Sequence, residues 1–150
     1  MTAIREAVLP LKLSYEIVIT DDFSSDNSWK VLKELATADP CVRGLRFAFN
    51  CGQSAAMWAG MKATRGKFIV TLDADLQNDP RDIPLFMDAL QKCDCVCGTR
   101  VAARSQGDNF VRTASSRIAN WVRNKLSGET ISDAGCCFRA FKRECIADLA

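Results

Sequence analysis

The residues of this chain that could do chemistry are mainly carboxylates in two polar loops, and the denser loop is Asp73-Ala-Asp75-Leu-Gln77. It follows residues 68–72, whose β-branched and apolar side chains predict a buried strand. Two carboxylates one residue apart, with an amide nearby, can ligate Mg²⁺ or Mn²⁺, which prefer oxygen ligands and share them with substrate phosphates. Such a cation would neutralise charge on a diphosphate leaving group. A plain polar turn is the alternative, because Asp is a common turn residue.

A second acidic loop, residues 21–28, follows a strand predicted over residues 15–20. Asp21 and Asp22 stand nearest the strand end and suit recognition of a nucleobase or ribose, because a carboxylate accepts hydrogen bonds from ring N–H groups and hydroxyls. Asp26 suits capping of the helix that follows. Both roles can hold in one loop.

The basic residues that could bind anions lie later in the chain. Arg100 follows a predicted strand end, so its guanidinium could hold a phosphate bidentately, or could pair with nearby carboxylates as an ordinary surface arginine. Residues 110–126 interleave basic side chains with Phe, Val, Ile, Trp and Leu. This pattern suits a helix at a membrane interface, or a helix that packs on the domain with its charged face in water.

The composition excludes several kinds of chemistry and partner. The 150 residues include no histidine, which excludes a histidine general base, a histidine-activated nucleophile and a histidine-ligated zinc. The net charge of +2, from 20 basic and 18 acidic residues, gives no signature of nucleic acid binding. No apolar run approaches the roughly 18 residues that a membrane span needs.

The eight cysteines are interpreted as reduced thiols in a cytosolic setting, because neither an apolar leader nor a compact disulfide spacing accompanies them. Cys93, Cys95 and Cys97 alternate along a predicted strand and so share one face. A zinc site would need a further ligand, for which Cys136 and Cys137 are the candidates. Small buried thiols in the core are the favoured interpretation.

The elements that must position these residues alternate between strand and helix. Strands are predicted over 15–20, 42–49, 67–72 and 93–98, and helices around 29–35, 53–64 and 80–92. This order predicts one α/β domain with a largely parallel sheet covered by helices on both faces. Ligands of such sheets bind beyond the carboxyl ends of the strands, so both acidic loops are expected on one rim.

Four segments, in this order and spacing, resemble the family 2 glycosyltransferases of GT-A fold: residues 15–28, Asn50-Cys-Gly-Gln53, residues 66–77 and Gly98-Thr-Arg100. Residues 110–115 and 133–143 resemble the polyprenyl-phosphate subgroup of that family. Within the subgroup the pattern is similar to undecaprenyl-phosphate 4-deoxy-4-formamido-arabinose transferases and, more distantly, to dolichyl-phosphate mannosyltransferases. The resemblance runs from about Tyr15 to Ala150.

The resemblance implies a role for each matching residue. It places Asp21, Asp22 and Asp73 at the nucleotide, and Asp73, Asp75 and Gln77 at a Mg²⁺ or Mn²⁺ ion and the donor diphosphate. It assigns donor or acceptor phosphates to Arg100, Arg112 and Arg139. It assigns catalysis to Asp75, Arg100 and Asp133, with Asp133 near the acceptor.

The implied activity is metal-dependent, inverting transfer of a sugar from a nucleotide-sugar, preferably a UDP-sugar, to a polyprenyl phosphate lipid. A lipid monophosphate, whose second pKa is about 6, is anionic near neutral pH and needs no strong base, which agrees with the absence of histidine. Positioning and electrostatic stabilisation should suffice. The expected location is cytoplasmic, peripheral at the cytoplasmic face of the membrane, with contact through residues 110–126.

Two alternatives stay open beside this function. One is a GDP-mannose-dependent dolichyl-phosphate transferase. The other is a truncated, inactive glycosyltransferase fragment that acts at most as a binding module. Association into a homo-oligomer is open in each case.

The chain also departs from the family pattern. The family's first strand, with its Pro-x-Tyr-Asn-Glu loop, has no counterpart before Met1, and its membrane helices are absent beyond Ala150. We therefore expect residues 1–150 to form a partial catalytic domain that lacks the first strand and exposes sheet edges. Phe23 stands where glycine is frequent in the family, so we expect an ordinary backbone conformation at this position.

Overall fold

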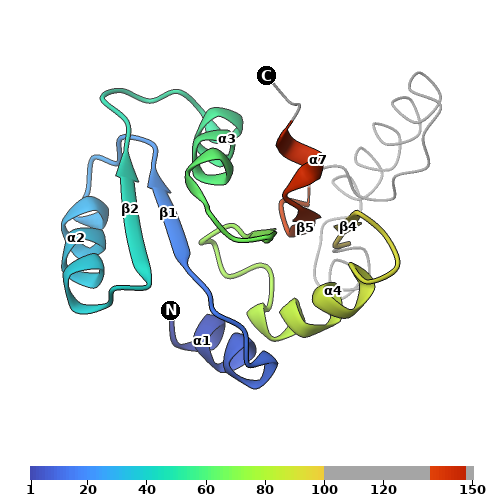
Figure 1. Cartoon of the computed structure of the whole chain (residues 1–150). Coiled ribbons are helices and arrows are strands. Elements are labelled where there is room, and N and C mark those ends of the chain that lie inside the picture. Colours follow the sequence, from blue (N-terminus) through green and yellow to red (C-terminus); the bar gives the residue numbers. More distant parts are fainter. Residues whose placement is uncertain (100–135, 148–150) are drawn as a thin grey trace, which may run out of the picture.

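A computed structural model of the chain describes residues 1–99 and 136–147, and it confirms the α/β class. Helices and strands alternate through the first 97 residues (Figure 1). In chain order the elements are α1 (Thr2–Val8), η1 (Leu9–Leu11), β1 (Ile17–Asp21), α2 (Ser28–Ala38), β2 (Val42–Arg46), α3 (Gln53–Ala63), β3 (Phe68–Thr71), η2 (Pro80–Asp82), α4 (Ile83–Ala89), β4 (Cys95–Cys97), β5 (Arg139–Lys142) and α7 (Glu144–Ala147). The predicted strands are all present but shorter by one to three residues.

The described strands form two sheets. β1 and β2 pair in parallel, from Ile17 opposite Val42 to Asp21 opposite Arg46. The second sheet has the order β3-β5-β4, and β5 is antiparallel to both neighbours, so β3 and β4 run in the same direction. The parallel direction predicted for the first four strands therefore holds within each sheet, and β5 is a strand that the sequence pattern did not predict.

The main core lies on the β3-β5-β4 sheet, under α4 and α1. Phe86 of α4 stacks on Phe138, with ring centroids 4.3 Å apart. Leu90, Cys136 and Ala140 are at most 1% exposed beside them, and Ala7 brings α1 into the same cluster. The α1 helix, like β5, has no counterpart in the sequence prediction, although Ile4, Ala7, Val8 and Leu11, which pack in or against this core, have the i, i+3, i+4, i+7 spacing of an amphipathic helix.

The three cysteines of the β4 region are exposed, so the prediction that they are buried core thiols is wrong. Cys95 and Cys97 do share a face, with their Sγ atoms 4.0 Å apart. The intervening Val96 points the other way and packs against the core. The core therefore takes the valine, and the two thiols face outward.

The two sheets are linked by side chains and by α3, which contacts both β1 and β3. In Figure 1 the β1–β2 pair lies with α2 on one side, β5 and β4 lie with α4 and α7 on the other, and α3 stands between them. No described helix is long and apolar enough to cross a membrane.

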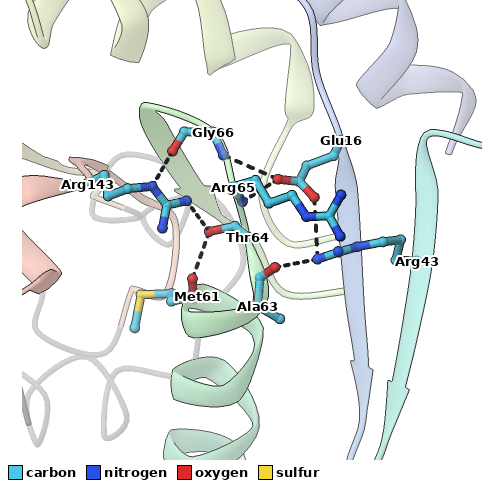
Figure 2. A network of polar contacts seen from close by, with 8 residues as sticks. All are labelled: Glu16, Arg43, Met61, Ala63, Thr64, Arg65, Gly66 and Arg143. Atoms are coloured by element: carbon cyan, nitrogen blue, oxygen red, sulfur yellow. Dashed lines mark hydrogen bonds and ion pairs between the residues drawn. The ribbon is translucent and has the colours of Figure 1, made fainter.

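Glu16, just before β1, is the centre of the polar link shown in Figure 2. Its Oε1 accepts the backbone N–H groups of Arg65 and of Gly66, the latter at 3.2 Å. Its Oε2 lies 3.4 Å from Nη2 of Arg43, which also donates to the carbonyl of Ala63 at the end of α3. One carboxylate therefore joins the β1–β2 pair to the segment that leads into β3.

Arg143 makes the matching link from the other sheet (Figure 2). Its Nε donates to the Gly66 carbonyl at 2.7 Å and its Nη2 donates to Thr64 Oγ1 at 3.0 Å. Thr64 in turn donates to the Met61 carbonyl at 2.7 Å. The segment between α3 and β3 is thus held from both sides, which fixes where β3 and its following loop begin.

Candidate functional site

The loop after β1 is held by Asp21, which is 6% exposed. Its Oδ1 accepts the N–H of Ser24 at 3.2 Å. Its Oδ2 lies 3.2 Å from Arg46 Nε as an ion pair, but at an angle that leaves this buried oxygen without a hydrogen bond. The Arg46 guanidinium also lies over the rings of Phe23 and Trp29, at 5.5 and 5.6 Å. Asp21 is therefore a buried carboxylate with one acceptor position to spare.

Phe23 adopts a left-handed backbone conformation, with φ of 63°. A large side chain suffers a steric penalty there that glycine avoids. The contact with Arg46 offsets part of that penalty. The sequence expectation that Phe23 demands an ordinary backbone conformation is therefore wrong.

Asp22 binds the loop that follows β2. Its Oδ1 accepts the backbone N–H of Cys51 at 2.7 Å, and its Oδ2 accepts Gly52 N–H at 2.8 Å and Asn50 Nδ2 at 3.0 Å. Gly52 has φ of 88°, a conformation that suits glycine and aims its N–H at the carboxylate. Asp22 therefore fixes the position of residues 50–52 relative to the loop after β1.

Gln53 extends this connection to the loop after β3. Its Nε2 lies 3.1 Å from Asp73 Oδ1 and 3.2 Å from Cys137 Sγ. As the first residue of α3, Gln53 is fixed by the same Asp22-bound loop. Loops after β1, β2 and β3 are thus joined through two side chains, Asp22 and Gln53.

Asp75 lies in the same loop as Asp73 and is exposed. Its Oδ1 accepts the backbone N–H of Gln77 at 3.1 Å, which is the bond of an Asx turn. Leu76 between them has φ of 62° and is 94% exposed. The loop therefore has the geometry of a polar turn, which was the alternative to a metal site in the sequence analysis. The turn bond uses only Oδ1 of Asp75 and does not involve Oδ2.

A metal ion would find oxygen ligands here but no complete cage. In the described part of the chain, no group of three or more His, Cys, Asp or Glu side chains lies so that it could hold a metal ion. Asp73, Asp75 and Gln77 are hard oxygen donors of the type that Mg²⁺ and Mn²⁺ prefer. Mg²⁺ sites often use one or two carboxylates and complete their coordination with water and substrate phosphates, so the donor set fits such an ion.

Arg139 lies at the start of β5, at the register position opposite Thr71, the last residue of β3. Thr71 Oγ1 donates to the Cys137 carbonyl at 2.6 Å, and Arg139 Nε donates to the Cys136 carbonyl at 3.1 Å. Since Cys137 also contacts Gln53, Arg139 belongs to the same rim as Asp73.

Asn78 closes the acidic loop against the core. Its Oδ1 faces Cys136 Sγ at 3.7 Å, while its buried Nδ2 has no hydrogen-bond partner. Neither Asn78 nor Gln53 was predicted as a site residue. The signal for Gln53 was its place in the Asn50–Gln53 segment at a helix start, whereas nothing in the sequence pattern marked Asn78.

Two further carboxylates of these loops have structural roles. The Ser28 hydroxyl and backbone N–H, the latter at 2.9 Å from Oδ1, lower the pKa of Asp26. This bond satisfies one free N–H of the first turn of α2, as expected, but the N-cap position is Asn27 and not Asp26. The Arg81 guanidinium and backbone N–H lower the pKa of Asp79, which caps η2.

A hollow of about 670 Å³ opens beside these loops. It is bordered by β1, by the polar loop before α2, by one side of α2 and by Ala74 in the loop after β3. Both acidic loops therefore border this one hollow, the opening of the site, as expected from the strand order.

The described residues do not include several predicted site residues, namely Arg100, Arg112, Asp133 and the basic stretch 110–126.

The comparisons with known proteins agree with this arrangement. The family described as glycosyl transferase family 2 matches residues 2–149. Curated relatives named undecaprenyl-phosphate 4-deoxy-4-formamido-L-arabinose transferase are 38% identical over 91% of this chain in Proteus mirabilis, and 33% identical over 97% in Aeromonas hydrophila. A third, from Serratia proteamaculans, is 38% identical over 88% of the chain. The chain spans 41%, 44% and 40% of the lengths of these relatives, respectively.

Proposed function

The chain belongs to glycosyl transferase family 2, and from this premise we propose that it binds a nucleotide-sugar, preferably a UDP-sugar, for transfer of the sugar to a polyprenyl phosphate. The observation that carries the proposal is the continuous contact from Asp22 through the 50–52 loop and Gln53 to Asp73. This contact brings three strand-end loops to one opening. The name of the relatives supports a polyprenyl phosphate acceptor.

In this proposal Asp21 and Asp22 line the nucleoside end and Asp73 lies between it and the diphosphate. The spare acceptor position of buried Asp21 suits a ring N–H or a ribose hydroxyl. Asp22 would act indirectly, because its oxygens already bind the 50–52 loop. Preference for uracil over guanine rests on the resemblance of residues 133–143.

The diphosphate would lie over the loop after β3. Asp73, Asp75 and Gln77 would hold a Mg²⁺ or Mn²⁺ ion there, which supplies positive charge against the departing nucleoside diphosphate. Gln53 orients Asp73 through its amide, and the turn bond from Gln77 orients Asp75. Arg139, together with Arg100 and Arg112, would bind the phosphates of donor or acceptor.

The chemical step needs little from the protein beyond position. The phosphate oxygen of the lipid attacks the anomeric carbon, the bond to the diphosphate breaks, and the configuration inverts. Asp133 is assigned to the acceptor side and Asp75 and Arg100 to the reacting centre. Residues 110–126 would rest on the cytoplasmic face of the membrane, where the acceptor lipid is found.

A second candidate is a binding module without catalysis. The observation in its favour is that the described residues form no three-ligand metal group and that Asp22 is occupied by its own loop. Such a module would bind nucleotide weakly and without a metal requirement.

Calorimetric titration of the 150-residue protein with UDP and with GDP, each with and without Mn²⁺, separates these candidates. We expect UDP to bind only with Mn²⁺, and Asp75→Ala to abolish that binding. Asp88→Ala, which removes an exposed carboxylate from α4, is the matched control and should bind as the wild type does. A folded protein that binds neither nucleotide with Mn²⁺ would refute the transferase proposal.

A further inference from the structure

Two exposed thiols lie next to each other on β4. Cys95 and Cys97 are separated by one residue, so their side chains share one face of the strand, and their Sγ atoms are 4.0 Å apart. Val96 between them packs against the core on the opposite face. The two thiols therefore face solvent from the same side of the strand.

The backbone that carries this thiol pair is held by β5. Both cysteines belong to the antiparallel ladder between the two strands. On either side of the pair, Gly98 donates its N–H to the Phe138 carbonyl at 2.8 Å and Lys142 donates its N–H to the Asp94 carbonyl at 3.0 Å. Backbone hydrogen bonds flank the pair at both ends, so the sheet fixes the spacing of the two Cα atoms.

The separation of the two sulfurs suits a shared cation better than a disulfide. A disulfide needs its sulfurs about 2.05 Å apart and its Cα atoms within about 6.8 Å. Residues two apart on a strand have Cα atoms roughly 6.6–6.8 Å apart, at the upper limit of that range. Two sulfurs that each lie about 2.3 Å from one cation are about 3.8 Å apart at a tetrahedral angle and about 4.6 Å apart on a straight line. The 4.0 Å between the sulfurs of Cys95 and Cys97 lies inside this interval.

The number of available ligands decides which cation fits. Structural Zn²⁺ takes four ligands, but within residues 1–99 and 136–147 no group of three or more His, Cys, Asp or Glu side chains could hold a metal ion. The zinc ligands considered from the sequence have other neighbours, since Cys136 Sγ lies 3.7 Å from Asn78 Oδ1 and Cys137 Sγ lies 3.2 Å from Gln53 Nε2. Two thiolates alone suit a soft cation that is stable with few ligands, and Cu(I) is such a cation.

We propose that Cys95 and Cys97 bind one Cu(I) ion as two thiolates on the outer face of β4. Each thiol releases its proton to water as its sulfur bonds to the ion, because the thiolate is the metal ligand, and no electron is transferred. Arg139, opposite Cys97 on β5, offsets the net negative charge that two thiolates and one monovalent cation leave. Neither cysteine borders the hollow, so copper binding does not depend on the proposed nucleotide site.

The test titrates the reduced 150-residue protein with Cu(I) under argon, in competition with the chromogenic chelator bicinchoninate. We expect the wild type to hold one equivalent. Cys97→Ser removes a ligand and should weaken binding on the order of a hundredfold or more, since even the outer partners of metal ligands are worth 10–100-fold in affinity. Cys93→Ser removes an exposed thiol that donates to the Ala89 carbonyl, and as the matched control it should bind as the wild type does. Equal binding by the wild type and Cys97→Ser, or equal losses in the two variants, would overturn the proposal.

Labelling of the wild type keeps the proposal testable if a serine variant folds poorly. One equivalent of Cu(I) should slow the reaction of Cys97 with N-ethylmaleimide, read by mass spectrometry, and leave the exposed Cys51 and Cys93 unchanged. X-ray absorption on the same sample should show two sulfur neighbours of copper. Protection of Cys51 or Cys93 to the same degree as Cys97, or three sulfur neighbours, would place the ion at a different set of thiols and overturn the proposal.

Discussion

Gln53 Nε2 lies 3.1 Å from Asp73 Oδ1, so the first side chain of α3 is bonded to the first carboxylate after β3. The bond joins residues 20 positions apart and is the direct link between the β1–β2 side of the opening and the acidic loop. Asp73 is half-buried and Gln53 is exposed at the rim. The arrangement of these two segments therefore depends on an uncharged side chain at position 53 that can donate a hydrogen bond to Asp73.

Gln53→Glu tests that dependence. It places a second carboxylate beside Asp73, and like charges at this distance disfavour joint ionisation. We expect the free energy of unfolding at pH 7 to fall by about 1–2 kcal/mol, and the loss to shrink near pH 4 because the pair can share a proton. Urea unfolding at the two pH values measures both effects. Gln91→Glu, at an exposed turn position two residues after α4, is the control, and an equal loss in it would contradict this account.

Asp22→Ala removes the acceptor of three hydrogen bonds at once. Cys51 and Gly52 lose their backbone partner, and we expect a loss of about 1–3 kcal/mol in the free energy of unfolding. Asp22→Asn keeps one acceptor oxygen and should cost roughly half as much. Urea unfolding measures the losses, with Asp88→Ala as a matched removal of an exposed carboxylate. A wild-type midpoint for Asp22→Ala would mean that water replaces all three bonds.

Gly98→Ala tests the packing after β4. A methyl group there would lie 2.9 Å from the Phe138 carbonyl oxygen and 3.1 Å from Phe86 Cζ. Since one of these atoms belongs to the backbone, the strand must shift, and we expect a loss of about 1–3 kcal/mol in the free energy of unfolding. Thermal and urea unfolding measure it. The exposed Ser54→Ala should change stability little, and a Gly98→Ala protein as stable as that control would contradict the close packing of Gly98 on Phe138.

The sequence predicted the first half of the fold well because that half is built from local signals. The strand before Asp21 and the strand before Asp73 each combine a β-branched run with a polar turn. The prediction that these two loops border one opening followed from the order of the strands alone. Their positions relative to each other were therefore predictable without any knowledge of side-chain contacts.

The rest depended on contacts distant in sequence. β5 is only Arg-Ala-Phe-Lys, and it is a strand because residues 68–71 and 95–97 pair with it from both sides. Cys95 and Cys97 were wrongly predicted to be buried. Alternation along a strand shows which residues share a face, but it does not show which of the two faces is covered. Gln53 and Asn78 gain their roles only through Asp73 and Cys136, which no spacing rule connects to them.

The Cys95 thiol should be slow to alkylate. Burial, followed by the charge and hydrogen bond of Cys97, raises its pKa to about 11, although part of the side chain reaches solvent. The thiolate is the reactive form, so the thiol at pH 8 should react on the order of a hundredfold more slowly than in the urea-unfolded protein. Iodoacetamide labelling followed by mass spectrometry measures the rate. Cys97→Ser removes the second cause and should speed labelling, and a rate that is equal at pH 8 and pH 10.5 would contradict the raised pKa.

Asp39 should make stability depend on pH at the acidic end. Its carboxylate accepts the Cys41 N–H at 2.9 Å and pairs with Arg5 of α1, and these contacts lower its pKa below 3.8, the Cys41 bond contributing most. A lowered pKa in the folded state means that the stabilisation is present above pH 3.8 and is lost as the pH falls through the folded value. Asp39→Asn keeps the shape but not the charge, so its deficit in urea midpoint should be largest near pH 6 and should close below pH 3.8. Arg5→Gln leaves the Cys41 bond in place and should show a smaller deficit with the same sign. A deficit of Asp39→Asn that stays constant from pH 6 to pH 3 would mean that the loss comes from altered packing and not from the charge.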